Sequence, residues 1–166
     1  MSMKIGVLAL QGAFAAHARA LEALGHDPVL VRQPRHLEGV EGLVLPGGES
    51  TTQLSLLDRL GLWAPLDALV RAGAPTLCTC AGLILAAREV THPAQRSFGW
   101  LDVSVARNAW GRQVDSFEAQ ADPPLDLPLV FIRAPRITRA GADVEVLAAL
   151  EGEPVLVRQG HVTGAT

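Results

Sequence analysis

The sequence predicts an α/β fold with a central mixed, mostly parallel β-sheet and helices on both faces. Short apolar runs alternate with segments of helical periodicity through the first half of the chain. These runs are almost continuously apolar, which is typical of parallel strands buried on both faces. The length of 166 residues suits one such domain with a sizeable core and is too short for two.

The first half is predicted to form four strands that alternate with helices. Residues 4–10 (KIGVLAL) are short, apolar and followed by Gln-Gly, which indicates a buried strand. Residues 13–25 place Phe14 and Leu21 on one helical face and end in glycine, a common helix stop. The further strands are expected at residues 28–32, 42–45 and 74–79, and the further helices at residues 50–60, 64–71 and 81–89.

The second half is predicted to contain mainly strands. Glycine and proline separate its short apolar runs, and few stretches have helical spacing. We interpret residues 122–128 (DPPLDLP) as a loop within the same domain and not as a linker. The strands are expected at residues 101–107, 114–120, 129–132, 144–150 and 154–158.

Three chemically distinctive segments follow predicted strands. Gln11-Gly12 follows the first strand, residues 47–50 (GGES) follow the third, and Cys80 follows the fourth. Ligands of open α/β sheets bind beyond the carboxyl ends of the strands. We therefore expect the three segments to converge on one site.

The only two cysteines, Cys78 and Cys80, lie where an apolar strand gives way to a helix. A structural zinc site usually needs four ligands, and the sequence has neither a second cysteine pair nor a suitable histidine pair. A disulfide between strand residues two apart is sterically awkward. We therefore predict no metal site, and we expect Cys78, inside the strand, to be a buried core thiol.

Cys80 differs because it stands at the strand-to-helix junction, before Ala81-Gly82. The positive end of a helix favours the thiolate, and small residues allow a sharp turn. The segment has the pattern of a nucleophile elbow, with cysteine as nucleophile and Cys78 in place of the first glycine. The local pattern alone leaves two interpretations of Cys80 open, a nucleophile and an inert thiol.

The turn at residues 46–52 (PGGESTT) also has two interpretations. It is an ordinary strand-to-helix connection with Ser50 or Thr51 as the helix cap, or its Gly-Gly pair directs backbone N–H groups at a developing oxyanion. It lacks the Gly-Lys-Ser/Thr ending of a phosphate-binding loop.

Composition excludes several classes of partner. The net charge of −3 is not the excess of positive charge that is typical of proteins binding nucleic acid or an anionic membrane. The first apolar run is shorter than a membrane span and lacks the features of a signal peptide. Two cysteines in such a chain indicate a reducing compartment, so we expect a cytoplasmic protein.

Six motifs identify a family resemblance that runs through almost the whole chain. They are IGVLALQG (5–12), LPGGESTT (45–52), TCAGLILAA (79–87), ARNAWGRQVDSFEA (106–119), FIRAPRI (131–137) and VRQGHV (157–162). On these motifs the chain resembles class I, triad-type glutamine amidotransferases. More narrowly, it resembles the glutaminase subunit of pyridoxal 5′-phosphate synthase, the PdxT/SNO family.

The resemblance implies a class I amidotransferase fold, flavodoxin-like with three layers, and hydrolysis of L-glutamine to glutamate and ammonia. It also implies delivery of ammonia to a separate barrel-shaped synthase subunit (PdxS/SNZ-like), with no cofactor held by this subunit. By position Cys80 is the nucleophile, and the N–H groups of Gly48 and Ala81 form the oxyanion hole. The residues at glutamine-binding positions are Gly48, Glu49, Ser50, Arg107, Ile132 and Arg133.

The sequence contains no match to the family's catalytic base, which is carried in a His-Pro-Glu motif just after the last strand. His161 lies within the predicted last strand, and His92 is followed by Pro-Ala. We expect a single domain over residues 1–166 that stops short of this motif, with the base beyond Thr166. The alternatives are an inactive binding or regulatory subunit and an amidotransferase domain that serves another pathway.

Overall fold

The computed structural model describes residues 1–107 and 116–166. The central part of the 106–119 motif and the first residues of the strand predicted at 114–120 lie outside the described residues. Among the described residues, none of the helices is long and apolar enough to cross a membrane.

The described chain is built around a seven-stranded sheet with the order β10-β11-β12-β4-β3-β1-β2. Five neighbouring strands of this sheet are parallel, and the two at the β10 edge are antiparallel to their neighbours. The parallel strands are β1 (Lys4–Leu8), β2 (Asp27–Val31), β3 (Gly42–Leu45), β4 (Thr76–Thr79) and β12 (Val162–Ala165). The antiparallel strands are β10 (Glu145–Leu150) and β11 (Glu153–Gln159). The predicted mixed, mostly parallel sheet is therefore confirmed.

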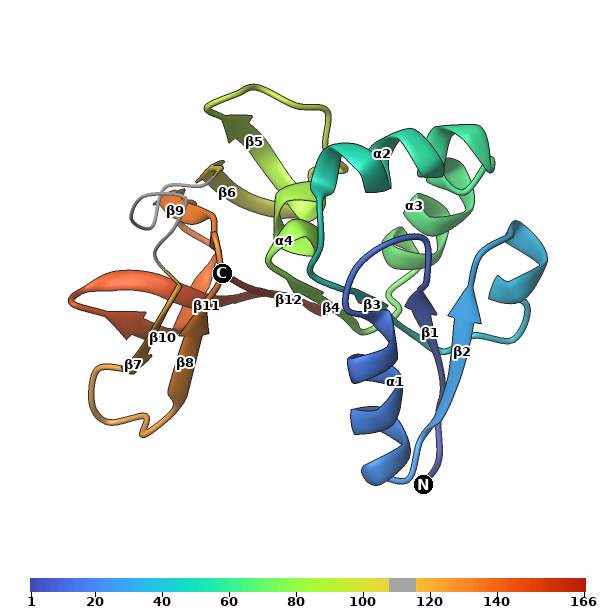
Figure 1. Ribbon diagram of the computed structural model, residues 1–166, viewed down its shortest axis with the longest axis horizontal. Coiled ribbons are helices and arrows are strands. Elements are labelled where there is room, and N and C mark those ends of the chain that lie inside the picture. The colour runs from blue at the N-terminus through green and yellow to red at the C-terminus, as the bar shows by residue number, and fades with distance from the viewer. Residues whose placement is uncertain (108–115) are drawn as a thin grey trace.

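Helices cover both faces of this sheet (Figure 1). Right-handed crossovers that leave β1 and β3 in opposite directions place their helices on opposite sides. Accordingly α1 lies on one side, against β1 and β2, and α2 and α3, which connect β3 to β4, lie on the other. Helix α4 follows β4 and lies on that second side, against β3, β4, β12 and α2. The helices are α1 (Phe14–Ala23), α2 (Ser50–Arg59), α3 (Trp63–Arg71) and α4 (Ala81–Ala86), with a short 3-10 turn η1 (Pro34–Leu37) after β2.

Two smaller sheets flank the β10 side of the central sheet. One has the order β5-β6-β9, and the other is the hairpin of β7 and β8. Their bounds are Ala87–Thr91 for β5, Leu101–Ala106 for β6, Phe117–Gln120 for β7, Pro128–Phe131 for β8 and Arg136–Ala140 for β9. The predicted loop at 122–128 connects β7 to β8 almost as expected.

The helix predicted at residues 81–89 is wrong in its last three residues. Helix α4 ends at Ala86, and β5 begins at Ala87 and pairs in parallel with β6. Strands β9 and β12 were not predicted, because 136–140 and 162–165 are short and carry little apolar periodicity. In each case pairing with a distant strand decides the conformation.

The main core lies between the central sheet and α2, α3 and α4. All six residues of α4 are buried, so this helix is hydrophobic all round and lies inside the molecule. Cys78 has 0% exposure within this core, which confirms the prediction of a buried thiol. A second, smaller core packs the β7–β8 hairpin onto β10 and β11, and its central residue is Phe131.

Candidate active site

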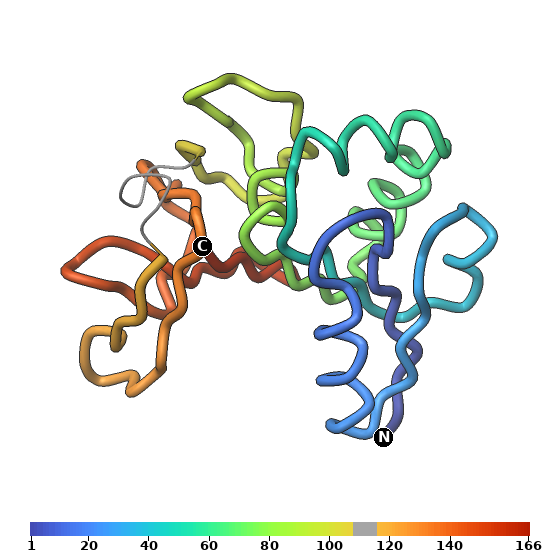
Figure 2. The backbone as a smooth tube through the Cα atoms, in the orientation of Figure 1, coloured from blue at the N-terminus to red at the C-terminus, as the bar shows by residue number. Residues whose placement is uncertain are grey.

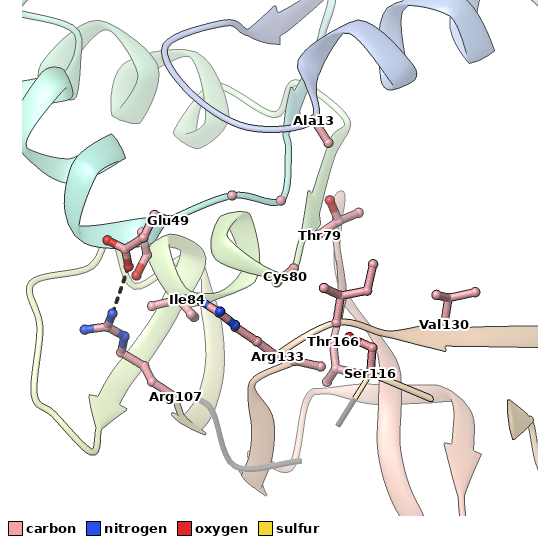
Figure 3. A pocket seen from close by; sticks show the side chains of 15 residues that line it. Ala13, Glu49, Thr79, Cys80, Ile84, Arg107, Ser116, Val130, Arg133 and Thr166 are labelled. Carbon is pink, nitrogen blue, oxygen red and sulfur yellow. Dashed lines mark hydrogen bonds and ion pairs between the residues drawn. The ribbon is translucent and has the colours of Figure 1, made fainter. Parts of the chain in front are cut away.

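A cavity of about 1040 Å³ opens where β3, β4 and β12 end. It collects the segments after these strands together with residues from α4 and the β7–β9 region, as Figure 3 shows. The expected convergence of the 47–50 loop with Cys80 is thus present, and Gln11-Gly12 lies directly behind that loop. The lining residues are Ala13, Gly47, Gly48, Glu49, Ser50, Thr79, Cys80, Ile84, Arg107, Ser116, Val130, Ile132, Arg133, Ala134 and Thr166.

Cys80 occupies a sharp turn between β4 and α4. Its φ of 47° and ψ of −106° lie in a region that residues other than glycine rarely adopt, and such strain is typical of nucleophile elbows. The turn is held on both sides: the Cys80 N–H donates to the Ala165 carbonyl at 2.9 Å, and the Cys80 carbonyl accepts from Ile84 N–H at 3.1 Å. The side chain is therefore presented at the cavity wall from a rigid backbone.

Two opposing influences act on the Cys80 thiol. Burial raises its pKa, while hydrogen bonds from the N–H groups of Ala81 and Gly48 to the sulfur favour the thiolate. The same two N–H groups were expected to form an oxyanion hole, and both are directed at the Cys80 sulfur. For Cys78, complete burial raises the pKa far above the usual range, which makes this thiol inert.

The loop that carries Gly48 is held by the end of β1. The Ala13 N–H donates to the Gly47 carbonyl at 3.0 Å, and the Gln11 side-chain oxygen accepts from Glu49 N–H at 2.8 Å. Gly12 has a φ of +100°, and a Cβ there would lie 2.0 Å from the Gly47 oxygen. Only glycine allows this approach, so the β1 loop sets the position of Gly48.

Arg107 supplies a buried cation at the far end of the cavity. Its side chain is 10% exposed and pairs with the Glu49 carboxylate at 3.1 Å (Figure 3). Its Nε is buried and has no hydrogen-bond partner among residues 1–107 and 116–166. A hydrogen bond from the Thr51 hydroxyl and the charge of Arg107 lower the pKa of Glu49, so this carboxylate is ionised at neutral pH. Arg107 lines the cavity, so a guanidinium group already paired with Glu49 stands in its wall.

The other predicted binding residues also reach the cavity. Arg133 has a left-handed φ of 49°, and in Figure 3 its side chain extends toward Ile84. Ile132 is 64% exposed at the rim, whereas Ser50 is buried in the wall and bonded to Gln95. The structure therefore brings the predicted site residues into one cavity or its wall.

No histidine among the described residues hydrogen bonds to Cys80. His161, predicted inside a strand, lies in the turn between β11 and β12 and contacts the Val70 carbonyl at 2.6 Å. His17 on α1 lies nearer, with Nε2 3.2 Å from the Thr79 hydroxyl, and burial lowers its pKa. Sequence reasoning missed this contact because helical spacing does not reveal a partner 62 residues away.

The chain matches the SNO glutamine amidotransferase family over residues 7–166. The chain belongs to this family. A pyridoxal 5′-phosphate synthase subunit PdxT of Koribacter versatilis (strain Ellin345) is 52% identical, over 99% of this chain and 86% of that protein. The PdxT subunit of Pelotomaculum thermopropionicum (strain DSM 13744 / JCM 10971 / SI) is 50% identical, over 98% of this chain and 85% of that protein.

A solved structure agrees with this family assignment. The crystal structure of a glutamine amidotransferase superimposes with a TM-score of 0.89 at 45% identity, over 97% of this chain and 87% of that one. The class I amidotransferase fold expected from the motifs is therefore confirmed. Membership of the SNO family also confirms the expected class of enzyme, a glutamine amidotransferase.

The raised pKa of Cys80 leads to a prediction for this SNO family member. Alkylation by iodoacetamide should accelerate with rising pH, with a midpoint above that of an unperturbed cysteine, because burial disfavours the thiolate. Mass spectrometry of the Cys80 peptide across neutral and alkaline pH measures the rate. Cys78 serves as the internal control and should react only after denaturation. A midpoint below that of free cysteine would contradict the prediction.

Proposed function

We propose that this protein hydrolyses L-glutamine to L-glutamate and ammonia, with Cys80 as the nucleophile. The observation that carries the proposal is the placement of the Cys80 sulfur against the N–H groups of Gly48 and Ala81, in a cavity that also holds Arg107. A nucleophile, two oxyanion donors and a cation are three of the parts that a glutaminase needs, and a general base is the fourth.

The reaction follows from these parts. The Cys80 thiolate attacks the side-chain amide carbon, and the carbonyl oxygen gains negative charge beside the Gly48 and Ala81 N–H groups. Collapse of the tetrahedral intermediate breaks the C–N bond, and the nitrogen leaves as ammonia with the proton that the general base took from the Cys80 thiol. Water then attacks the thioester, which releases glutamate and restores the thiol.

The substrate's charged end fits the opposite part of the cavity. The Arg107 and Arg133 guanidiniums suit the α-carboxylate, since guanidinium groups bind carboxylates in a fixed geometry. Glu49 pairs with Arg107 and Ser50 follows it in the cavity wall, and both residues offer oxygen atoms to the α-ammonium group. Ile132 forms the rim above them. Gly48, Glu49, Ser50, Arg107, Ile132 and Arg133 together make the proposed glutamine pocket.

The general base is proposed to enter at the β12 side of the cavity. Thr166 lines the cavity, and the preceding residue, Ala165, accepts the hydrogen bond from the Cys80 backbone. A residue carried just after Thr166 would begin at this wall, close to the thiol. The expected His-Pro-Glu base fits that place.

The ammonia is proposed to serve a synthase partner in the cytoplasm. The relatives of 52% and 50% identity are named as PdxT subunits of pyridoxal 5′-phosphate synthase. By that similarity the partner is a barrel-shaped synthase subunit that consumes ammonia. Both cysteines are free, which fits a reducing compartment.

Ammonia release tests this function directly. The protein, expressed from its full reading frame, is incubated with L-glutamine, alone and with the synthase subunit, and ammonia is measured by a coupled dehydrogenase assay. We expect turnover with glutamine that rises in the complex, and none with L-asparagine, whose amide lies one methylene closer to the α-carbon. Complex formation without ammonia release would instead support the inactive binding subunit.

A further inference from the structure

The Ser50 hydroxyl in the cavity wall is bonded to a side chain that lies behind it. Ser50 begins α2 and is 1% exposed, and its hydroxyl donates to the side-chain oxygen of Gln95 at 3.0 Å. Gln95 does not line the cavity. It lies on the loop between β5 and β6, which arches at the top of Figure 2 from β5 toward the start of α2.

The loop that carries Gln95 is anchored to α2 and α3. Arg96 pairs with Asp58 at 2.8 Å and stacks over the Trp63 ring at 3.8 Å. Phe98 stacks between Trp63 and Trp100, with ring centroids 3.8 and 4.1 Å apart. The ion pair is half exposed and contributes little, so the ring stacks do most of the anchoring. Gln95 is thus held against Ser50 by its immediate chain neighbours.

The direction of this hydrogen bond determines what Ser50 offers to a ligand. A serine hydroxyl has one hydrogen to donate and two lone pairs. Since the hydrogen is directed to Gln95, only lone pairs remain on the oxygen for another partner. The neighbouring Glu49 carboxylate is also an acceptor, whereas Arg107 is a donor. This part of the cavity therefore places acceptors beside a donor, and an amino acid's ammonium and carboxylate groups require both kinds.

We propose that Gln95 is a positioning residue that makes Ser50 an acceptor for the α-ammonium group of the substrate. Gln95 thereby contributes to the selection of an α-amino acid over the same molecule without its amino group. The inference rests on the proposed function, because it assumes that glutamine occupies the cavity. The Gln95 amide nitrogen is buried and has no partner in the described part of the chain, so the bond to Ser50 is the one hydrogen bond that this side chain makes there.

Isothermal titration calorimetry with two ligands tests the proposal. L-Glutamine and glutaramate, its analogue without the amino group, are titrated into the wild-type protein and Gln95→Leu. We expect Gln95→Leu to weaken glutamine binding about five- to tenfold, as for loss of one hydrogen bond, and to change glutaramate binding less than about twofold. Equal weakening of both ligands would show a merely structural role and overturn the proposal.

Two further variants keep the test independent of folding. Gln95→Glu retains an oxygen facing Ser50 and should bind glutamine at least as well as the wild type, whereas a loss like that of Gln95→Leu would overturn the assigned direction. Ser50→Ala should weaken glutamine binding selectively, and adding Gln95→Leu to it should cost nothing more. Thermal denaturation checks that each variant is folded. If the wild type binds neither ligand, the proposed glutaminase function is wrong. That result differs from failure of the Gln95 proposal, in which the wild type binds glutamine but Gln95→Leu weakens both ligands equally.

Discussion

Replacing Cys80 with alanine is expected to reduce ammonia release from L-glutamine by more than about a thousandfold in the complex with the synthase subunit. The side chain is presented at a strained turn with its sulfur against two N–H groups, and no other cysteine reaches the cavity among the described residues. Steady-state assay of the variant complex measures the loss. Persistent turnover would exclude Cys80 as the nucleophile.

Cys78→Ala is the matched control for this experiment. The sulfur of Cys78 packs in the main core and has 0% exposure, so its removal leaves a small void and costs about 1 kcal/mol of folding stability. The turnover number should remain close to that of the wild type. A loss of turnover as large as that of Cys80→Ala would mean that the two thiols act together.

Replacing Gly82 with alanine is expected to lower the free energy of unfolding by more than about 3 kcal/mol. A Cβ at this position would lie 2.1 Å from the Leu45 carbonyl oxygen and 2.8 Å from its carbon, so β3 and α4 would have to separate. The methyl group cannot be accommodated by rotation of a side chain, because the obstacle is backbone. Urea denaturation followed by circular dichroism measures the change.

Gly42→Ala provides the comparison for Gly82→Ala. Gly42 also lies against the backbone, yet a Cβ there would be 3.3 Å from the Pro75 oxygen and requires only a small adjustment. We expect its unfolding free energy to stay within about 1 kcal/mol of the wild type. Similar losses in the two variants would show that the close contact of α4 with β3 is not what makes Gly82 necessary.

The sequence predicted the parts of the fold that depend on local periodicity. The apolar strand 42–45 and the helix that begins at Ser50 lie where expected, because their burial pattern repeats within a few residues. Residues 87–91 did not follow this rule. Their neighbours in sequence favoured a helix, but pairing with β6 made them a strand.

The sequence also determined the residues with which the candidate site is built. Residues 47–50 and Cys80 stand just after strands of the parallel part of the central sheet, and parallel strands bring such positions to one edge. Cys80 and the Gly47-Gly48 pair could therefore be named from the strand pattern, whereas Arg107, Ile132 and Arg133 were named from the family motifs alone.

Only the tertiary structure decided how these residues are held. The contact of Gln95 with Ser50 spans 45 positions, and that of His17 with Thr79 spans 62. The approach of Gly12 to the Gly47 oxygen likewise joins two separate loops. Such contacts produce no periodic pattern in the sequence. They depend on how whole helices, strands and loops pack together and not on the neighbouring residues in the chain. The sequence thus determined which groups are present, and packing determined which atoms face one another.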